Sequence, residues 1–305
     1  MASAEWTSWR PLRLAQDIPA ELLPEQLDGG QSFRWDREPD GSWTGVFGDT
    51  PASLRHGPRG LEWRGLAGAS GTEAALRDYL DASGAQARLA EALPWRSDPV
   101  LRAARDAYAG LRILRQDPHE ALIGFLCSSN KRILQIRTMV AALAKNLGEP
   151  LGGGFHAMPT WKAIATADEA VLRSCALGYR AAYLRGTAQK LLARGRWARE
   201  FAELDTPALL DELRSLPGVG PKVASCVALF GFARLECFPV DTWVVQALAD
   251  AYGLRGWKPE QLEQFGRTHF GAGAGLAQQF LFSAARHGKL PSAEISQPVR
   301  PRSRR

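Results

Sequence analysis

Lys222 and Asp241 are the two side chains whose types and spacing suggest covalent chemistry. Lys222 closes the segment Leu216-Pro217-Gly218-Val219-Gly220-Pro221-Lys222, and Asp241 follows within Phe238-Pro239-Val240-Asp241-Thr242. A lysine amine that has lost its proton can attack an electrophilic carbon and form a Schiff base. A nearby carboxylate can stabilise positive charge that develops on that carbon. The pair therefore predicts a lysine nucleophile assisted by an aspartate.

The segment around Lys222 predicts two helices joined by a tight turn. Gly218 and Gly220 allow the turn and the close approach of another backbone, and Pro221 suits the first position of the second helix. The free N–H groups at that helix start form a site for an anion such as a DNA phosphate. The same positive helix end disfavours the ammonium form of Lys222. A plain helix–helix turn, with the lysine as a phosphate contact, is the alternative.

Two further residues are positioned by this arrangement. Cys226 lies four residues after Lys222 and therefore on the same helical face, although a small core residue is the simpler interpretation. Asp241 has the position of an N-cap for a helix beginning at Thr242, and capping could be its only role. A carboxylate held by a helix N-terminus is expected to stay ionised.

The elements that must position these residues change in kind along the chain. Before about residue 90, strand patterns predominate: Phe33 and Trp35 alternate within a strand predicted over 31–38, a turn over 39–41 follows, and 42–48 predicts the return strand. Leu61 and Trp63 predict another strand of a half-buried antiparallel sheet. A helix is predicted over 72–82.

From Asp98 onward the pattern predicts helices only. Asp98 and Asp117 are expected N-caps, and Gly148 is an expected helix stop. Helices are predicted over 100–111, 120–127, 133–147, 181–194, 206–216, 221–232, 242–252 and 274–287, with no strand between them. The predicted fold class is α+β, with an antiparallel sheet domain over 1–97, an all-α domain over 98–288 and a basic disordered tail over 289–305.

Composition and charge exclude several classes of protein. The 305 residues are 45% hydrophobic and 23% charged, as in ordinary globular proteins. The net charge is +6, but the tail from residue 289 contributes five basic side chains against one acidic one, so basicity alone is weak evidence for DNA binding. No apolar run could span a membrane and no signal peptide is evident, so we expect an intracellular monomer without a membrane partner.

The cysteines and histidines do not predict a metal site. Cys127, Cys175, Cys226 and Cys237 match no zinc or iron–sulfur spacing, and the five histidines are scattered. We therefore expect four reduced thiols in a reducing compartment and no metal ligands.

The lysine of the hairpin, with Pro-Val-Asp about twenty residues later, resembles the helix–hairpin–helix glycosylase superfamily. Further segments resemble one branch, the 8-oxoguanine DNA glycosylase/AP lyase family, and they occur in that family's order between about 30 and 285. These are Gly30-Gln31-Ser32-Phe33-Arg34-Trp35, Leu114-Arg115-Gln116-Asp117-Pro118, Cys127-Ser128-Ser129-Asn130, Leu177-Gly178-Tyr179-Arg180 and Leu281-Phe282-Ser283-Ala284.

The resemblance implies a reaction on double-stranded DNA that contains 8-oxoguanine. Lys222 would attack the sugar C1′ and expel the base, and the resulting Schiff base would permit β-elimination and strand nicking. Asp241 would stabilise the oxocarbenium-like transition state. No cofactor would be required, although a monovalent or divalent cation could bind at the hairpin.

The resemblance also implies a set of residues that recognise the flipped base. Cys226 and Phe282 would sandwich it, and Gln278, one helical turn before Phe282, would bond its Watson–Crick edge. The carbonyl of Gly30 would accept a hydrogen bond from N7–H of the oxidised base. Normal guanine carries a lone pair at N7, so the carbonyl would face another acceptor and stay unpaired.

A further set would contact the rest of the DNA. Asn130, Tyr179 and Arg180 would fill the gap and hold the orphaned cytosine, offsetting part of the cost of unstacking. The turn residues Gly218, Val219 and Gly220 would approach the phosphates.

The chain departs from the family's pattern at two places. Gln135 stands where the family commonly has an arginine that touches the orphaned cytosine. A neutral amide has fewer donors than a guanidinium, which predicts a relaxed preference for cytosine opposite the lesion. Trp243 and Ala285 stand where the family often has a histidine and an acid, which predicts that packing replaces their contact.

Four alternatives remain open at this point. An alkylated-purine glycosylase would share the architecture but works without a lysine nucleophile, and the iron–sulfur branches would need a cysteine cluster. A non-catalytic helix–hairpin–helix module would bind DNA without releasing a base. A transferase with a reactive lysine is the most remote.

Overall fold

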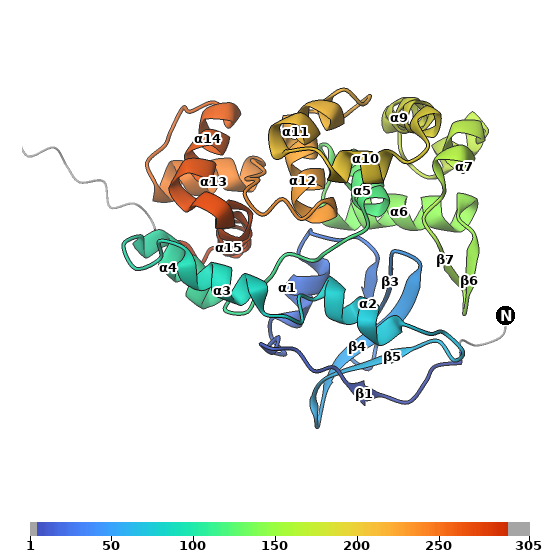
Figure 1. Ribbon diagram of the computed structural model, residues 1–305, viewed down its shortest axis with the longest axis horizontal. Coiled ribbons are helices and arrows are strands. Elements are labelled where there is room, and N and C mark those ends of the chain that lie inside the picture. The colour runs from blue at the N-terminus through green and yellow to red at the C-terminus, as the bar shows by residue number, and fades with distance from the viewer. Residues whose placement is uncertain (1–4, 292–305) are drawn as a thin grey trace, which may run out of the picture.

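A five-stranded antiparallel sheet forms one end of the molecule in the computed structural model, which describes residues 5–291 (Figure 1). Its order is β1-β5-β4-β3-β2, from β1 (Arg10–Pro11), β2 (Trp35–Arg37), β3 (Trp43–Phe47), β4 (Thr50–Gly57) and β5 (Gly60–Gly65). The register places Leu54 opposite both Trp43 and Trp63, and all three side chains are buried. This row of large apolar side chains forms the core face of the sheet.

Helices make up most of the remaining chain, and Figure 1 shows them in two groups across from the sheet. Near the sheet lie α1 (Leu23–Asp28) and α2 (Thr72–Tyr79), whereas α3 (Ala85–Ala92) and α4 (Pro99–Ala107) pack against the last helix, α15. One group contains α5 (Pro118–Ser128), α6 (Ile133–Leu147), α7 (Trp161–Thr166), α8 (Glu169–Ser174), α9 (Arg180–Arg194), α10 (Trp197–Ala202), α11 (Thr206–Arg214) and α12 (Pro221–Gly231). The other contains α13 (Thr242–Ala251), α14 (Pro259–Phe270), the short η1 (Gly271–Gly273) and α15 (Ala274–Arg286).

The predicted α+β class is confirmed, and so is each predicted helix, within a few residues of its predicted ends. The expected N-caps are also present: Asp98 accepts from Leu101 N at 2.8 Å, and Asp117 accepts from His119 N at 2.8 Å. The helix predicted to reach residue 111 ends at Ala107, because the chain turns at Gly110 with φ +98°. Strands β1 and β4 and helices α1, α3, α7, α8, α10 and α14 were not predicted.

The strand predicted over 31–38 is wrong over its first half, since β2 covers only Trp35–Arg37. Residues 31 and 32 are buried but bond outside a sheet: Gln31 Nε2 donates to the Arg112 carbonyl at 2.9 Å, and Ser32 Oγ donates to Leu27. Polar side chains that hydrogen-bond to other backbone segments compete with strand pairing. The predicted burial of Phe33 and Trp35 is confirmed.

The expectation that no strand interrupts the helical part is also wrong. Strands β6 (Pro150–Gly152) and β7 (Phe155–His156) form a small antiparallel pair after α6. Gly152, Gly153 and Gly154 all have positive φ, between 59° and 87°, a conformation that glycine adopts without strain. This run of glycines turns the chain sharply and brings the two short segments together.

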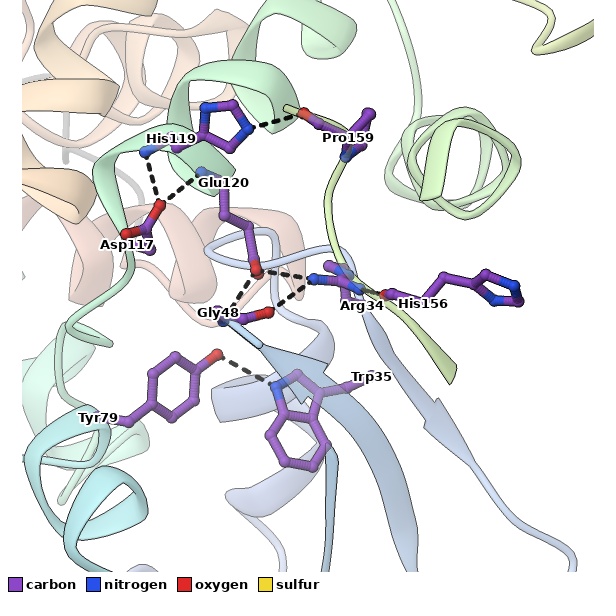
Figure 2. A network of polar contacts seen from close by, with 9 residues as sticks. All are labelled: Arg34, Trp35, Gly48, Tyr79, Asp117, His119, Glu120, His156 and Pro159. Carbon is purple, nitrogen blue, oxygen red and sulfur yellow. Dashed lines mark hydrogen bonds and ion pairs between the residues drawn. The ribbon is translucent and has the colours of Figure 1, made fainter. Parts of the chain in front are cut away.

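A buried polar network ties the sheet, α5 and the β6–β7 pair together (Figure 2). Arg34 Nη1 donates to Glu120 Oε2 at 3.0 Å and to the Gly48 carbonyl at 3.1 Å, while Nη2 donates to the His156 carbonyl. Gly48 N–H donates to the same Glu120 oxygen at 3.0 Å. Both charged side chains are only 7% exposed. Burial raises the pKa of Glu120, and the Arg34 guanidinium opposes that shift. The network fixes the start of α5, whose other end approaches Lys222.

Several further expectations can be compared with the described residues. No helix among them is long and apolar enough to cross a membrane. All four cysteines are free and buried. Within residues 5–291, no group of three or more histidine, cysteine, aspartate or glutamate side chains could hold a metal ion. Most of the predicted tail, residues 292–305, lies outside the described residues. The domain boundary near 97 stays a prediction.

Candidate active site

Lys222 stands in the first turn of α12, as predicted, and its amine points toward the C-terminal end of α5. The side chain is half-buried, and Nζ donates to Ser128 Oγ at 3.3 Å. The Nζ atom also lies 5.3 Å from the centre of the Phe125 ring. Ser128 in turn donates to the Phe125 carbonyl at 2.7 Å. The amine is therefore located by contacts with another helix and remains partly accessible.

The turn before α12 has the predicted hairpin geometry at Gly218 but not at Gly220. Gly218 has φ +78°, and a Cβ there would lie 2.6 Å from Tyr183 Cβ, so only glycine fits. Gly220 is extended, with φ −87° and ψ −179°, and open space surrounds the position of a Cβ. Its small size leaves a clear approach to the start of α12. Val219 is buried and anchors the turn.

Helix α9 supports the hairpin along one face. Thr187 Oγ1 donates to the Pro217 carbonyl at 2.9 Å, and Lys190 Nζ donates to the Ser215 carbonyl at 2.6 Å. Tyr183 packs on Gly218 from the same helix. Residues three, four and seven positions apart share a helical face, which explains how one helix holds the whole turn.

Asp241 is the N-cap of α13, as predicted, and its Oδ1 accepts from Val244 N at 2.9 Å. The helix start favours the ionised form of Asp241, and its burial opposes that effect. Burial raises the pKa of Asp241, although the Val244 hydrogen bond and the positive charge of Lys222 oppose the shift. Among residues 5–291 no ion pair joins Lys222 to Asp241, yet the positive charge of Lys222 is close enough to lower the pKa of Asp241.

Cys226 is buried on the face of α12 that carries Lys222. Burial raises the pKa of the thiol to about 11, although the neighbouring Lys222 lowers it somewhat. The thiol therefore stays neutral near pH 7 and does not compete with the amine as a nucleophile. It can serve as an apolar wall.

The structure brings Gly30 and Phe282 together from opposite ends of the chain. Gly30 has φ +102°, and a Cβ there would lie 3.7 Å from Phe282 Cζ and 3.1 Å from Ile133 Cδ1. Phe282 is half-buried on α15, whereas Gln278, one turn earlier, is buried and accepts from Gln279 Nε2 at 2.8 Å. Five cavities among residues 5–291 have linings that include none of Gly30, Gln278 and Phe282.

The residues predicted to contact the opposite strand divide into exposed and buried ones. Asn130 is exposed with φ +54°, and Tyr179 is 55% exposed. Gln135 is exposed too, but its Oε1 accepts from Arg132 N at 3.1 Å and so helps to cap α6. Arg180 differs, because it is only 4% exposed and Nη2 donates to the Ser129 carbonyl and, at 3.2 Å, to the Tyr179 hydroxyl. Arg180 thus supports the loop that ends in Asn130.

Some neighbours of the site were missed or misjudged by the sequence analysis. Ser128 was quoted within a motif but given no role, although it contacts the amine of Lys222. Leu134 and Tyr183 are large exposed apolar side chains, 71% and 44% exposed, and nothing in their local pattern marks them. Trp243, on α13, is 44% exposed. The expectation that its packing replaces the contact of the family's histidine is therefore wrong.

Taken together, a helix–hairpin–helix, a lysine at its second helix and an aspartate N-cap nearby define a helix–hairpin–helix DNA glycosylase. Two family models match in succession: the 8-oxoguanine DNA glycosylase N-terminal domain over residues 18–122 and the HhH-GPD superfamily base excision DNA repair protein over residues 123–269. The chain belongs to the 8-oxoguanine DNA glycosylase/AP lyase family.

Similar proteins support this membership along nearly the whole chain. An N-glycosylase/DNA lyase from Arabidopsis thaliana is 34% identical over 95% of this chain and 84% of its own length. The 8-oxoguanine glycosylase/lyase of Clostridium acetobutylicum, solved with DNA containing cytosine opposite 8-oxoG, is 30% identical with a TM-score of 0.80, covering 88% of this chain and 92% of that one. A 3-methyladenine DNA glycosylase from Archaeoglobus fulgidus is 19% identical with a TM-score of 0.69 over 93% of this chain and 100% of that one, and shares the fold alone.

Proposed function

We propose that this chain is a bifunctional DNA glycosylase and AP lyase that removes 8-oxoguanine from duplex DNA. The observation that carries the proposal is the half-buried amine of Lys222, located at 3.3 Å from Ser128 and electrostatically coupled to Asp241. Relatives of this chain are N-glycosylase/DNA lyases, and one is named for acting on 8-oxoguanine. The reaction takes place on DNA, which makes the protein intracellular.

The reaction begins when the unprotonated amine of Lys222 attacks C1′ of the deoxyribose. The N–C1′ bond forms as the C1′–N9 bond breaks, and the departing base takes the electron pair and acquires a proton. Asp241 stabilises the positive charge that develops on the sugar. Ring opening gives a Schiff base, loss of a C2′ proton then expels the 3′ phosphate, and water releases the amine.

The base is held between Cys226 and Phe282. We propose that the half-buried Phe282 ring shifts as the flipped base enters. The buried Gln278 then exchanges its bond with Gln279 for bonds to the Watson–Crick edge of the base. The Gly30 carbonyl accepts from N7–H, which guanine lacks.

The rest of the duplex is held on the exposed side of the site. Asn130 and Tyr179 fill the gap that the flipped base leaves and contact the orphaned base. Arg180 positions Asn130 through its hydrogen bond to the Ser129 carbonyl. Gln135 leaves its capping bond to meet that base. The N–H groups at the start of α12, beyond Gly220, bind a phosphate of the lesion strand.

Neither step needs a cofactor, and any cation binds at the hairpin through main-chain carbonyls. Prolonged dialysis against EDTA should leave base release unchanged when assayed in K⁺. If the affinity for DNA were equal with and without K⁺ or Mg²⁺, a role for a cation at the hairpin in DNA binding would be excluded.

Borohydride trapping on a duplex containing 8-oxoguanine opposite cytosine tests the central claim. Wild-type protein should give a covalent adduct, and Lys222→Gln should give none. Lys145→Gln, which removes an exposed lysine in the last turn of α6, is the matched control and should trap normally. An undiminished adduct in Lys222→Gln would remove this residue from the mechanism.

The same experiment separates the proposal from its alternatives. An alkylated-purine glycosylase would release its base without a trapped adduct, and a binding module would release no base at all. A fold shared at 19% identity does not favour the alkylated-purine reaction. In neither alternative does the amine of Lys222 act as a nucleophile.

A further inference from the structure

We infer that Arg286 is a positioning residue for base recognition, acting through a clamp that it forms with Glu25. The inference rests on the proposed function, in which the Gly30 carbonyl reads the damaged base. Arg286 Nη1 donates to the Gly29 carbonyl at 2.7 Å, and Nη2 donates to Glu25 Oε2 at 2.8 Å. The arginine thereby joins the end of α15 to the end of α1.

The clamp is well enclosed and fully paired. The Glu25 and Arg286 side chains are 8% and 19% exposed. The second carboxylate oxygen of Glu25 accepts from Ser283 Oγ at 2.6 Å, so two residues of α15 hold the same carboxylate. A guanidinium that bonds two acceptors through separate nitrogens fixes their relative positions more strictly than a point charge would.

The clamp fixes the peptide on one side of Gly30. The Gly29 carbonyl, which belongs to the peptide joining Gly29 to Gly30, accepts from Arg286. On the other side, the Gln31 carbonyl accepts from Gln116 Nε2 at 2.7 Å. Within residues 5–291, the carbonyl of Gly30 between them accepts no hydrogen bond. The chain therefore holds both flanking peptides and leaves the one between them free for a donor on the ligand.

The same arginine also touches the ring that would stack on the base. The guanidinium carbon of Arg286 lies 5.5 Å from the centre of the Phe282 ring, one helical turn earlier on α15. Gln278, Phe282 and Arg286 are spaced by four, so they share one face of this helix. On this face, Gln278 would bond the Watson–Crick edge of the base, Phe282 would stack on it, and Arg286 would orient the Gly30 carbonyl.

Arg286→Ala tests the clamp through two reactions of one protein. Base release from 8-oxoguanine duplex should slow roughly 10- to 100-fold, because the Gly30 carbonyl loses its fixed direction and its bond to N7–H weakens. The ratio of the affinities for 8-oxoguanine duplex and for guanine duplex should fall by a similar factor. Strand cleavage at a preformed abasic site should change less than about twofold, because no base is read there.

Two variants sharpen the test. Arg286→Lys keeps the charge but lacks the fork, and it should resemble Arg286→Ala. Glu25→Gln should reduce base release in the same direction with a smaller effect, and it covers the case in which Arg286→Ala fails to fold. Arg105→Ala is the matched control, because Arg105 also pairs with a glutamate, Glu91, and lies 4.2 Å from the centre of an aromatic ring, Trp95. It should leave both reactions unchanged.

The outcomes are distinguishable from failure of the proposed function. Equal loss of base release and abasic-site cleavage in Arg286→Ala, or loss of neither, would overturn the clamp. Full activity of Arg286→Lys would also overturn it, because charge alone would then suffice. A wild-type protein that releases no base from 8-oxoguanine duplex would instead overturn the proposed function and the clamp with it.

Discussion

The reaction side of the site and its opposite-strand face are built in different ways. The reaction side consists of Lys222, Cys226, Asp241, Gln278 and Phe282, and the opposite-strand face of Asn130, Gln135 and Tyr179. On the reaction side, helices packed on one another hold buried or half-buried groups, as when Lys222 contacts Ser128. On the opposite-strand face, the side chains are exposed.

Adjacent residues illustrate the difference. Arg180 is 4% exposed and donates hydrogen bonds to the Ser129 and Leu177 carbonyls, whereas Tyr179 is 55% exposed. Under the proposed function, the protein itself holds Lys222 and Asp241 in place before DNA binds, whereas the exposed side chains of the opposite-strand face acquire their partners only from DNA. Changes under the reaction side should alter stability or rate, and changes on the opposite-strand face should alter binding or base preference.

The largest effect should come from the network beneath the reaction side. Glu120→Ala leaves the buried Arg34 charge without its carboxylate and should lower the free energy of unfolding by about 3–5 kcal/mol. Equilibrium unfolding in urea measures this change in the free energy of unfolding. Glu169→Ala removes a glutamate from an exposed ion pair with Arg173 and should cost less than about 1 kcal/mol. If both variants lowered the free energy of unfolding equally, the buried network would stabilise the protein no more than an exposed ion pair does.

Asp241→Asn should slow base release by about 10²–10³-fold, because a neutral amide cannot stabilise the charge on the sugar. Burial raises the pKa of Asp241, so its carboxylate is protonated at a higher pH than an ordinary aspartate as the solution is acidified. On its acid side, the wild-type rate profile should therefore contain a decrease above pH 3.8 that comes from Asp241, and Asp241→Asn should lack this decrease. Single-turnover rates against pH provide the measurement.

A second N-cap aspartate gives the control for that variant. Asp205 accepts from Ala208 N at 2.9 Å at the start of α11, in the same way that Asp241 accepts from Val244. Asp205→Asn should keep the wild-type rate and its acid limb. If both variants behaved alike, capping would account for Asp241 altogether.

Tyr179→Ala probes the opposite-strand face and should weaken binding to lesion duplex by about 1–3 kcal/mol, the range for a base stacked on an aromatic ring. Its free energy of unfolding should stay within about 0.5 kcal/mol of wild type, since the ring is exposed. Trp257→Ala removes another exposed aromatic side chain, 43% exposed, and should leave binding unchanged. A large stability loss in Tyr179→Ala would contradict the division between the two regions.

Gln135→Arg should have the smallest effect, sharpening the preference for cytosine opposite the lesion by about tenfold. Base release against each of the four opposite bases provides the measurement. Gln261 accepts from Lys258 N at 2.9 Å at the start of α14, in the same manner as Gln135 at α6, so Gln261→Arg controls for the lost capping bond. An unchanged spread over the four bases would end the hypothesis of a relaxed preference.

The amino-acid sequence by itself determined the fold class, most of the long helices and the hairpin that carries Lys222. These features rest on local rules: helical periodicity, N-cap residues such as Asp98 and Asp117, and the glycine at 218. The family of the chain also followed from its motifs. The sequence did not reveal the β6–β7 pair or the shortened β2, because non-local hydrogen bonds decide them.

Only the tertiary structure decided the environment of each functional group. Burial raises the pKa of Asp241 although its helix position favours the ionised form, and it directs Arg180 inward beside an exposed Tyr179. The clamp between Glu25 and Arg286 joins residues 261 positions apart, which no local pattern can signal. Spacing along the chain sets which groups are present on a helical face, whereas packing between distant segments sets their solvation and hydrogen-bond partners.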